Sequence, residues 1–155
     1  LHALPAQQLL DELHPLWSEQ GWALPQASGW GLDLCELLGP SLTLLKDGVD
    51  QARPFFESPD LEEDGLRQLE ADGARAAVAQ LLQTLEADPW DGSDLDRAKQ
   101  LLGDAATGAG VKKGVVMKSL RAALLGRLQG PDLMTTWSLL ARIGEDLPRL
   151  KRCLA

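Results

Sequence analysis

Positive side chains gather in the last third of this sequence, where they could hold the phosphates of a polyanion. Residues 111–155 carry 9 basic and 3 acidic side chains, a balance of +6, whereas residues 1–110 carry 6 basic and 20 acidic ones, a balance of -14. Lysine and arginine are the side chains that neutralise phosphates, and a polarised charge distribution both attracts a polyanion and orients it. From charge alone, a nucleic-acid face and a solvated basic face with no partner are equally good interpretations.

Residue types that catalyse reactions or bind metals are scarce. Histidine occurs only at His2 and His14, and neither stands at metal-ligand spacing from a cysteine. The acidic run of residues 60–64 could suggest paired catalytic carboxylates, but acidic residues at a helix start more often interact with the helix dipole or face solvent. We therefore expect no metal site, no bound cofactor and no self-contained active site in this chain.

The remaining global features are those of a cytoplasmic globular protein. Cys35 and Cys153, the only cysteines, lie far apart in the sequence, which is typical of unpaired thiols in a reducing compartment. Apolar residues never run together for the length of a membrane span, and no basic and apolar leader opens the chain, so we expect neither a membrane protein nor a secreted one. Because Leu1 is not a methionine, we expect the chain to be a segment of a longer protein.

Helices must position the basic residues, because apolar residues recur at helical spacing and no stretch alternates as a strand would. We therefore predict an all-α fold without a sheet. A helix over residues 112–128 has one apolar side, whereas Lys118 and Arg121, three residues apart, share another face. The other helices are expected at residues 4–19, 32–38, 41–52, 78–85, 95–102 and 133–140, with a last one ending at Lys151 and Arg152.

Two breaks divide this helical pattern. Gly39-Pro40 interrupts an apolar run, and proline suits a helix start, so a new helix should begin at Ser41 with Gly39 as the corner. The acidic, proline-containing stretch of residues 58–64 is the better domain boundary. We therefore predict two small helical subdomains, residues 1–57 and residues 58–155, of which the second ends in the basic segment.

Two separated segments resemble those of one known family. Residues 110–133, GVKKGVVMKSLRAALLGRLQGPDL, resemble the terminal signature of bacterial glutamyl-tRNA synthetases of a cyanobacterial-like type. Residues 42–48, LTLLKDG, which lead to Pro54-Phe55-Phe56, are similar to the helix and aromatic exit that open the anticodon-binding region of that family. The resemblance implies a helical cage that binds the anticodon end of a tRNA as one part of a glutamate–tRNA ligase.

The catalytic domain of that family has no counterpart in this chain. In the family this domain uses ATP and Mg²⁺ and precedes the anticodon-binding region, so the resemblance implies a non-catalytic segment of a class I aminoacyl-tRNA synthetase. The implied partner is glutamate tRNA, with no role for DNA or a membrane. The resemblance also implies that the chain acts as a monomer.

One site residue is expected to relax specificity. Many relatives carry an arginine where this chain has Gly39, and that arginine reads the third anticodon base, because a guanidinium offers two coplanar donors to a base edge. Glycine cannot make this contact. The resemblance therefore implies a non-discriminating enzyme that accepts glutamine tRNA as well as glutamate tRNA.

Five further residues are assigned to the anticodon site by the resemblance. Arg121 matches a family arginine near the anticodon loop, with Lys118 on the same helix face, and Gly130, Pro131 and Leu133 match the loop that packs on unstacked bases. RNA loops are bound by apolar surfaces for the bases and by cations for the phosphates, and these residues offer both. Without the family, Leu133 would be a core leucine and Arg121 a solvated cation.

The main alternative is a helical module that docks another protein through one apolar stripe, with no RNA ligand. Salt distinguishes the two, because phosphate contacts weaken steeply with salt concentration and a mainly apolar groove is much less sensitive. The tryptophans do not decide between them. They fall largely in apolar helical stripes and are expected in the core, with Trp137 the one candidate for an RNA contact.

Overall fold

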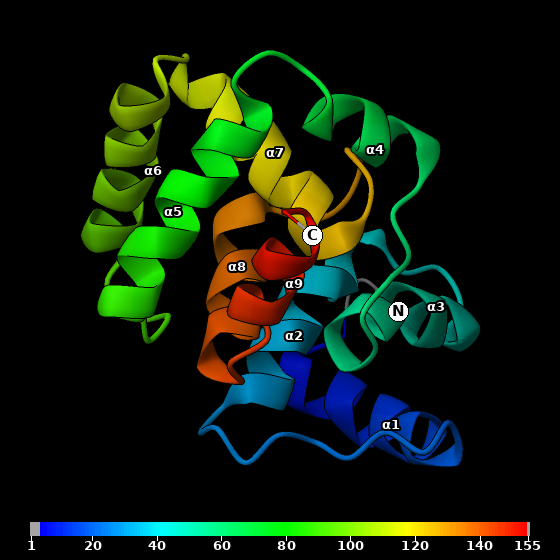
Figure 1. Ribbon diagram of the computed structural model, residues 1–155. Helices are drawn as coiled ribbons and strands as arrows, with labels where there is room; N and C mark the ends of the chain where they lie inside the picture. Colours follow the sequence, from blue (N-terminus) through cyan, green and yellow to red (C-terminus); the bar gives the residue numbers. More distant parts are fainter. Residues whose placement is uncertain (1–3, 155) are drawn as a thin grey trace. The chain divides into compact units, whose positions relative to one another are not determined.

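The computed structural model describes residues 4–154, and over these residues the chain is built from helices without a strand, which confirms the all-α prediction (Figure 1). Two compact units are formed, Leu1–Glu57 and Ser58–Ala155. The first unit holds α1 (Ala6–Glu19), α2 (Trp30–Leu38), the short 3-10 helix η1 (Gly39–Ser41) and α3 (Leu45–Phe56). The second unit holds α4 (Glu63–Leu69), α5 (Ala74–Ala87), α6 (Leu95–Ala109), α7 (Lys113–Leu125), α8 (Leu133–Arg142) and α9 (Asp146–Arg152).

The first unit is organised around an aromatic cluster. Phe56, at the end of α3, contacts three tryptophan rings with centroid distances of 5.2 Å to Trp17, 5.0 Å to Trp22 and 5.4 Å to Trp30. The three tryptophans are buried, in agreement with the expectation that the tryptophans lie in the core. Large aromatic rings in offset or edge contact supply much of the apolar area that a unit this small can bury.

Gly48, the glycine of the LTLLKDG segment, lies where α1 and α3 approach each other closely. A Cβ atom at Gly48 would lie 2.5 Å from Leu13 Cδ2 and 2.9 Å from its Cδ1. The backbone carbonyl of Gly48 also accepts a hydrogen bond of 3.1 Å from the buried Trp17 indole. Glycine is therefore required here by packing, because any side chain would displace Leu13.

The corner at Gly39 differs from the prediction of a helix beginning at Ser41. The chain makes the short turn η1 and then extends through Leu44 before α3 begins at Leu45. The reason is a local cap: the Asp47 carboxylate accepts the backbone N–H groups of Leu44 at 2.9 Å and Thr43 at 3.3 Å. An acidic residue at this position satisfies donors that the first helical turn leaves free.

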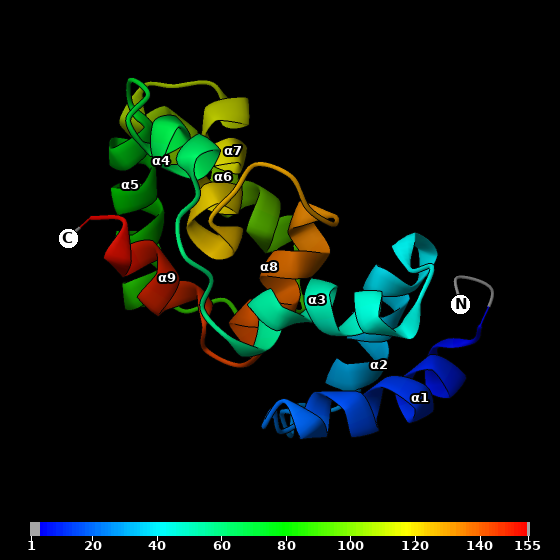
Figure 2. The ribbon, with the colours of Figure 1, turned by 90° about the vertical axis from the view of Figure 1, so that its right-hand side faces the viewer.

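In the second unit, α5 and α7 form the centre, and the other helices pack against them. Helix α6 covers α5 and α7, α4 packs on α7, and α9 lies against both central helices, an arrangement that can be followed in Figures 1 and 2. Helix α7 buries residues around most of its circumference, and it ends at Leu125 rather than at the predicted Leu128. It ends there because Gly126 adopts φ +78°, a left-handed conformation that terminates helices.

Both cysteines are buried free thiols, which confirms the prediction that they are unpaired. Burial raises the pKa of Cys35 to about 12 and also raises the pKa of Cys153. Such thiols remain protonated at neutral pH and are poor nucleophiles, so they serve the core. Across residues 4–154, none of the helices combines the length and the apolar character needed to cross a bilayer.

Candidate nucleic-acid interface

The connection between α7 and α8, residues 126–132, is fastened at four points, and we call it the anchored loop. It contains Gly130 and Pro131, two of the residues predicted to meet RNA. Four hydrogen bonds hold it to α7, α8 and the segment around the start of α4. They are Glu62 N–H to Gly126 O at 2.7 Å, Leu128 N–H to Asp64 Oδ2 at 3.1 Å, Arg121 Nη1 to Pro131 O at 2.7 Å, and Thr135 N–H to Asp132 Oδ2 at 3.0 Å.

Two glycines allow the anchored loop to approach its neighbours at backbone distance. A Cβ atom at Gly126 would overlap the carbonyl oxygen of Asp60, and one at Gly65 would overlap the carbonyl oxygen of Gly126. The start of α4 therefore lies directly against the end of α7. Neither position has room for a side chain, and backbone atoms cannot swing aside as a side-chain tip can.

Exposed cations lie on α7 and at the residue before it. Lys112, Lys113 and Lys118 are exposed, and no ion pair engages them within residues 4–154. Arg121 is half-buried on the same helix, where burial lowers its pKa and the nearby Asp132 carboxylate raises it. An arginine nevertheless keeps its charge at neutral pH. The helix therefore carries exposed ammonium groups together with one guanidinium that is hydrogen-bonded to the loop.

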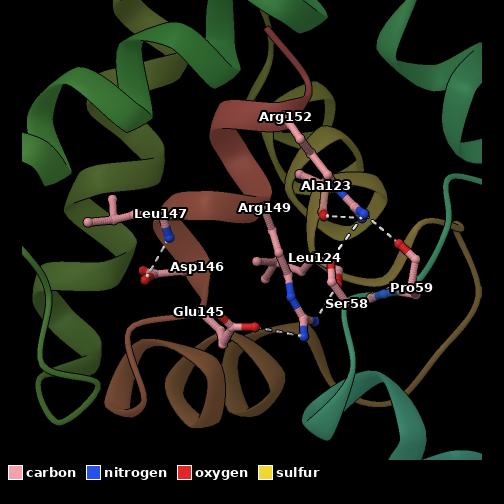
Figure 3. A network of polar contacts seen from close by, with 9 residues as sticks. All are labelled: Ser58, Pro59, Ala123, Leu124, Glu145, Asp146, Leu147, Arg149 and Arg152. Carbon is pink, nitrogen blue, oxygen red and sulfur yellow. Dashed lines mark hydrogen bonds and ion pairs between the residues drawn. The ribbon is translucent and has the colours of Figure 1, made fainter. Parts of the chain in front are cut away.

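Other cations of the basic segment are used to hold the unit together (Figure 3). Arg149 is 1% exposed, donates to Leu124 O at 2.9 Å and lies 3.6 Å from the Glu145 carboxylate. Arg152 donates to Ala123 O at 3.1 Å and to Ser58 Oγ at 3.1 Å. These two guanidinium groups satisfy carbonyls at the negative end of the α7 dipole, so they are not available to bind phosphates.

The anticodon binding domain family model matches residues 8–154 of this chain. The chain belongs to this family. Over its whole length it is 84% identical to a glutamate–tRNA ligase of Parasynechococcus marenigrum (strain WH8102), and over 99% of its length it is 73% identical to one of Synechococcus sp. (strain CC9605). It spans 32% of the length of each, so these cyanobacterial relatives extend well beyond it.

Solved structures support the fold of this anticodon-binding domain. A glutamate tRNA ligase from Elizabethkingia meningosepticum CCUG26117, in complex with its amino acid, superposes with a TM-score of 0.81 at 20% identity, covering 97% of this chain and 29% of that one. A second, from Elizabethkingia anophelis, gives a TM-score of 0.75 at 23% identity over 99% of this chain and 29% of that one. At these identities the likeness establishes the helical fold.

The structure brings together most of the predicted site residues of the second unit. Lys118 is exposed, Arg121 contacts the anchored loop, Gly130 is exposed and Pro131 is half-buried. Leu133 is only 4% exposed, which leaves almost no apolar surface for a base in this conformation. The roles of these residues in binding remain predictions, and Leu133 has the least geometric support.

Trp137 is not a surface residue, and its selection as a candidate RNA contact is corrected by its burial. It is 0% exposed, its ring centroid lies 4.6 Å from that of Trp90, and its indole N–H donates to Asp146 Oδ2 at 3.1 Å. An indole that is fully enclosed and already hydrogen-bonded presents no face on which a base could stack.

Gly39 lies in the first unit, at the junction of α2 and η1, and is buried. A Cβ atom there would meet Leu9 Cδ2 at 3.4 Å, an ordinary van der Waals distance, and its φ of -49° is accessible to any residue. Neither the local backbone nor the space at the Cβ position therefore requires glycine. This leaves the absence of a side chain at Gly39 open to a functional explanation.

The anchors themselves were missed by reasoning from the sequence. The acidic run of residues 60–64 was interpreted as a solvated or dipole-facing segment, yet Asp64 accepts the Leu128 amide across 64 positions of sequence. Arg149 and Arg152 were counted only as positive charge. The available signal was the pair Gly65 and Gly126, since glycines inside or at the end of a helix often mark a close backbone approach.

The free energy of unfolding should depend on pH through the buried carboxyl group of Asp146. Burial raises its pKa above the ordinary aspartate value, partly offset by hydrogen bonds from Trp137 and Leu147 N–H. In the unfolded chain this carboxyl ionises near pH 4, so the stability that it contributes is fully present below that pH and is lost as the pH rises through its folded pKa. Asp146→Asn removes this loss.

The free energy of unfolding of Asp146→Asn should therefore improve relative to the unchanged chain as the pH rises from about 4 to 7. A constant offset is expected as well, because an amide offers only one acceptor oxygen to two donors. Urea titrations followed by tryptophan fluorescence at several pH values measure the difference. Parallel pH profiles for the two chains would contradict the assignment.

Proposed function

We propose that this chain is the anticodon-binding part of a glutamate–tRNA ligase and that it holds the anticodon end of glutamate tRNA. The observation that carries the proposal is the anchored loop, which is held by Arg121 of α7, the helix that also carries the exposed Lys118, in a chain that belongs to the anticodon binding domain family. RNA loops are bound where splayed bases meet a shaped surface and cations hold the phosphates. In this domain the loop supplies the shape, and Lys118 and Arg121 supply the charge.

The proposal assigns no chemical step to these residues. Cys35 and Cys153 are buried, and within residues 4–154 no cluster of histidine, cysteine, aspartate and glutamate could hold a metal ion. The use of ATP and Mg²⁺ belongs, in this proposal, to the part of the ligase that lies outside the 32% of the relatives' length covered here. The domain contributes binding energy and orientation.

The proposal further includes relaxed reading of the third anticodon base at Gly39. A glycine has no side chain with which to contact a base, and this one sits where many relatives of the family that the sequence resembles carry an arginine. A Cβ atom there would meet Leu9 Cδ2 at 3.4 Å, an ordinary van der Waals distance. Discrimination between cytosine and guanine normally requires a placed donor or acceptor. The domain should therefore bind glutamate tRNA and glutamine tRNA alike.

A fluorescence titration of the chain against a glutamate tRNA transcript, at two salt concentrations, tests the function. Affinity should fall steeply with salt, with a slope set by the number of neutralised phosphates. The same transcript with guanine as its third anticodon base should bind equally well. Binding of protein partners but not of tRNA, with little salt dependence, would instead favour the helical docking module.

Gly39→Arg tests the relaxed reading directly. At a temperature where circular dichroism shows the variant folded, it should bind the cytosine and guanine transcripts with affinities that differ by about tenfold or more. Gly39→Ala is the matched control, because it adds the Cβ without donors and should stay indifferent to the base. Equal binding of both transcripts by Gly39→Arg would contradict a reading role for this position.

A further inference from the structure

Asp64 places a negative charge beside the anchored loop, where it should weaken the binding of phosphates. Asp64, in the first turn of α4, is half-buried and lines a polar pocket of about 450 Å³ together with Glu62, Glu63, Arg67, Arg127 and Gln129. A carboxylate near RNA opposes binding by charge repulsion. Its presence therefore needs a compensating role.

That role is visible in the hydrogen bond from Leu128 N–H to Asp64 Oδ2, at 3.1 Å. Leu128 follows the end of α7 at Leu125, so its amide stands outside the helical hydrogen-bond ladder and Asp64 is its acceptor. Hydrogen bonds from backbone amides to carboxylates are charge-assisted and stronger than neutral ones. This bond fixes the middle of the anchored loop.

The segment that carries Asp64 is itself held firmly. Arg152 donates to Ser58 Oγ and to Pro59 O while it also caps Ala123 O of α7, as Figure 3 shows. Four residues later, Glu62 N–H donates to Gly126 O at 2.7 Å. The residues that precede Asp64 are therefore connected to α7 by the hydrogen bonds of Arg152 and of Glu62 N–H.

We propose that Asp64 is a positioning residue for RNA binding, which holds the anchored loop in its binding conformation through the Leu128 amide. This inference rests on the proposed function. It predicts an effect with a sign opposite to that of simple electrostatics. Removing the acceptor should weaken RNA binding, although a negative charge has been taken away from the RNA-binding region.

Glu63 supplies a matched control from the adjacent position. It lines the same pocket, is exposed, and pairs with Arg67 one turn along α4 at 2.5 Å rather than with the loop. Exposed pairs of this kind contribute little to stability. Glu63→Ala therefore removes the same charge and leaves the loop anchored.

The test compares Asp64→Ala, Asp64→Asn and Glu63→Ala in titrations against a labelled glutamate tRNA transcript, at a temperature where circular dichroism shows each chain folded. Asp64→Ala should bind about tenfold more weakly than the unchanged chain. Asp64→Asn keeps an acceptor oxygen and should bind as well as the unchanged chain or better. Glu63→Ala should also bind equally or more tightly, because a repulsive charge is gone.

Binding by Asp64→Ala as tight as that by Glu63→Ala would overturn the positioning role while leaving the proposed function intact. If the unchanged chain shows no salt-dependent binding of the transcript, the proposed function and this inference are both overturned. If Asp64→Ala does not fold, Asp64→Glu carries the same test, because it keeps the charge but moves the acceptor. Asp64→Glu should bind more weakly than the unchanged chain, and unchanged affinity would again overturn the inference.

Discussion

Replacing Gly126 by alanine is expected to lower the free energy of unfolding of the second unit by about 3 kcal/mol. Two costs add. The residue adopts φ +78°, where an alanine pays about 1–2 kcal/mol, and its new methyl group would overlap the carbonyl oxygen of Asp60. Relief would require the acidic segment to move away from the end of α7. That movement would also strain the bond from Glu62 N–H to Gly126 O.

Gly110→Ala is the control that separates these two costs. Gly110 ends α6 with φ +68°, as Gly126 ends α7, but no atom lies within 4 Å of the position of its Cβ. It should therefore lose only the backbone cost of about 1–2 kcal/mol. Urea titrations of both variants measure the difference. Equal losses in the two variants would contradict the close packing of the acidic segment on α7.

Replacing Arg121 by alanine should reduce the affinity for glutamate tRNA by about tenfold at moderate salt. The side chain has two roles in this account. It donates to Pro131 O at 2.7 Å, which holds one end of the anchored loop, and it places a half-buried positive charge on the helix that is proposed to bind the phosphates. Its removal therefore loses both a shaped loop and a phosphate partner.

Lys118→Ala separates these roles, because Lys118 is exposed on the same helix and, within residues 4–154, forms no ion pair or hydrogen bond with the loop. It should weaken binding about threefold and reduce the magnitude of the salt slope by about one, as expected for a single phosphate contact. Arg121→Lys keeps the charge but lacks the planar fork, so it should remain closer to Arg121→Ala than to the unchanged chain. If Arg121→Lys binds the transcript as tightly as the unchanged chain, then Arg121 contributes only its positive charge and the hydrogen bond to Pro131 O does not matter for binding.

The helical fold could be predicted because its apolar periodicity is local, but its helix ends depend on single residues. Helix α7 stops at Leu125 because Gly126 is left-handed, and α3 begins at Leu45 because the Asp47 carboxylate caps it. In the sequence, Gly126 and Asp47 look like any other glycine and aspartate. Nothing in the periodicity distinguishes such a residue from its neighbours.

The candidate site was predicted less completely, because its architecture depends on contacts between distant segments. Charge counting treated Arg149 as one of nine cations, whereas it is buried and caps Leu124 O. The acidic residues 60–64 were expected to interact with the helix dipole or to face solvent, whereas Asp64 accepts the Leu128 amide. The family resemblance located Arg121 and the loop after α7, but burial at Leu133 and Trp137 depends on three-dimensional packing that no local pattern contains.

A nuclease footprint of a glutamate tRNA transcript tests the central claim most directly, because it shows which part of the RNA the chain covers. Protection is expected to be confined to the anticodon loop and its closing stem, to require about tenfold more protein in Arg121→Ala, and to be unchanged in Glu63→Ala. Protection of the acceptor end, or cleavage unchanged at chain concentrations that saturate binding, would contradict anticodon binding by this domain.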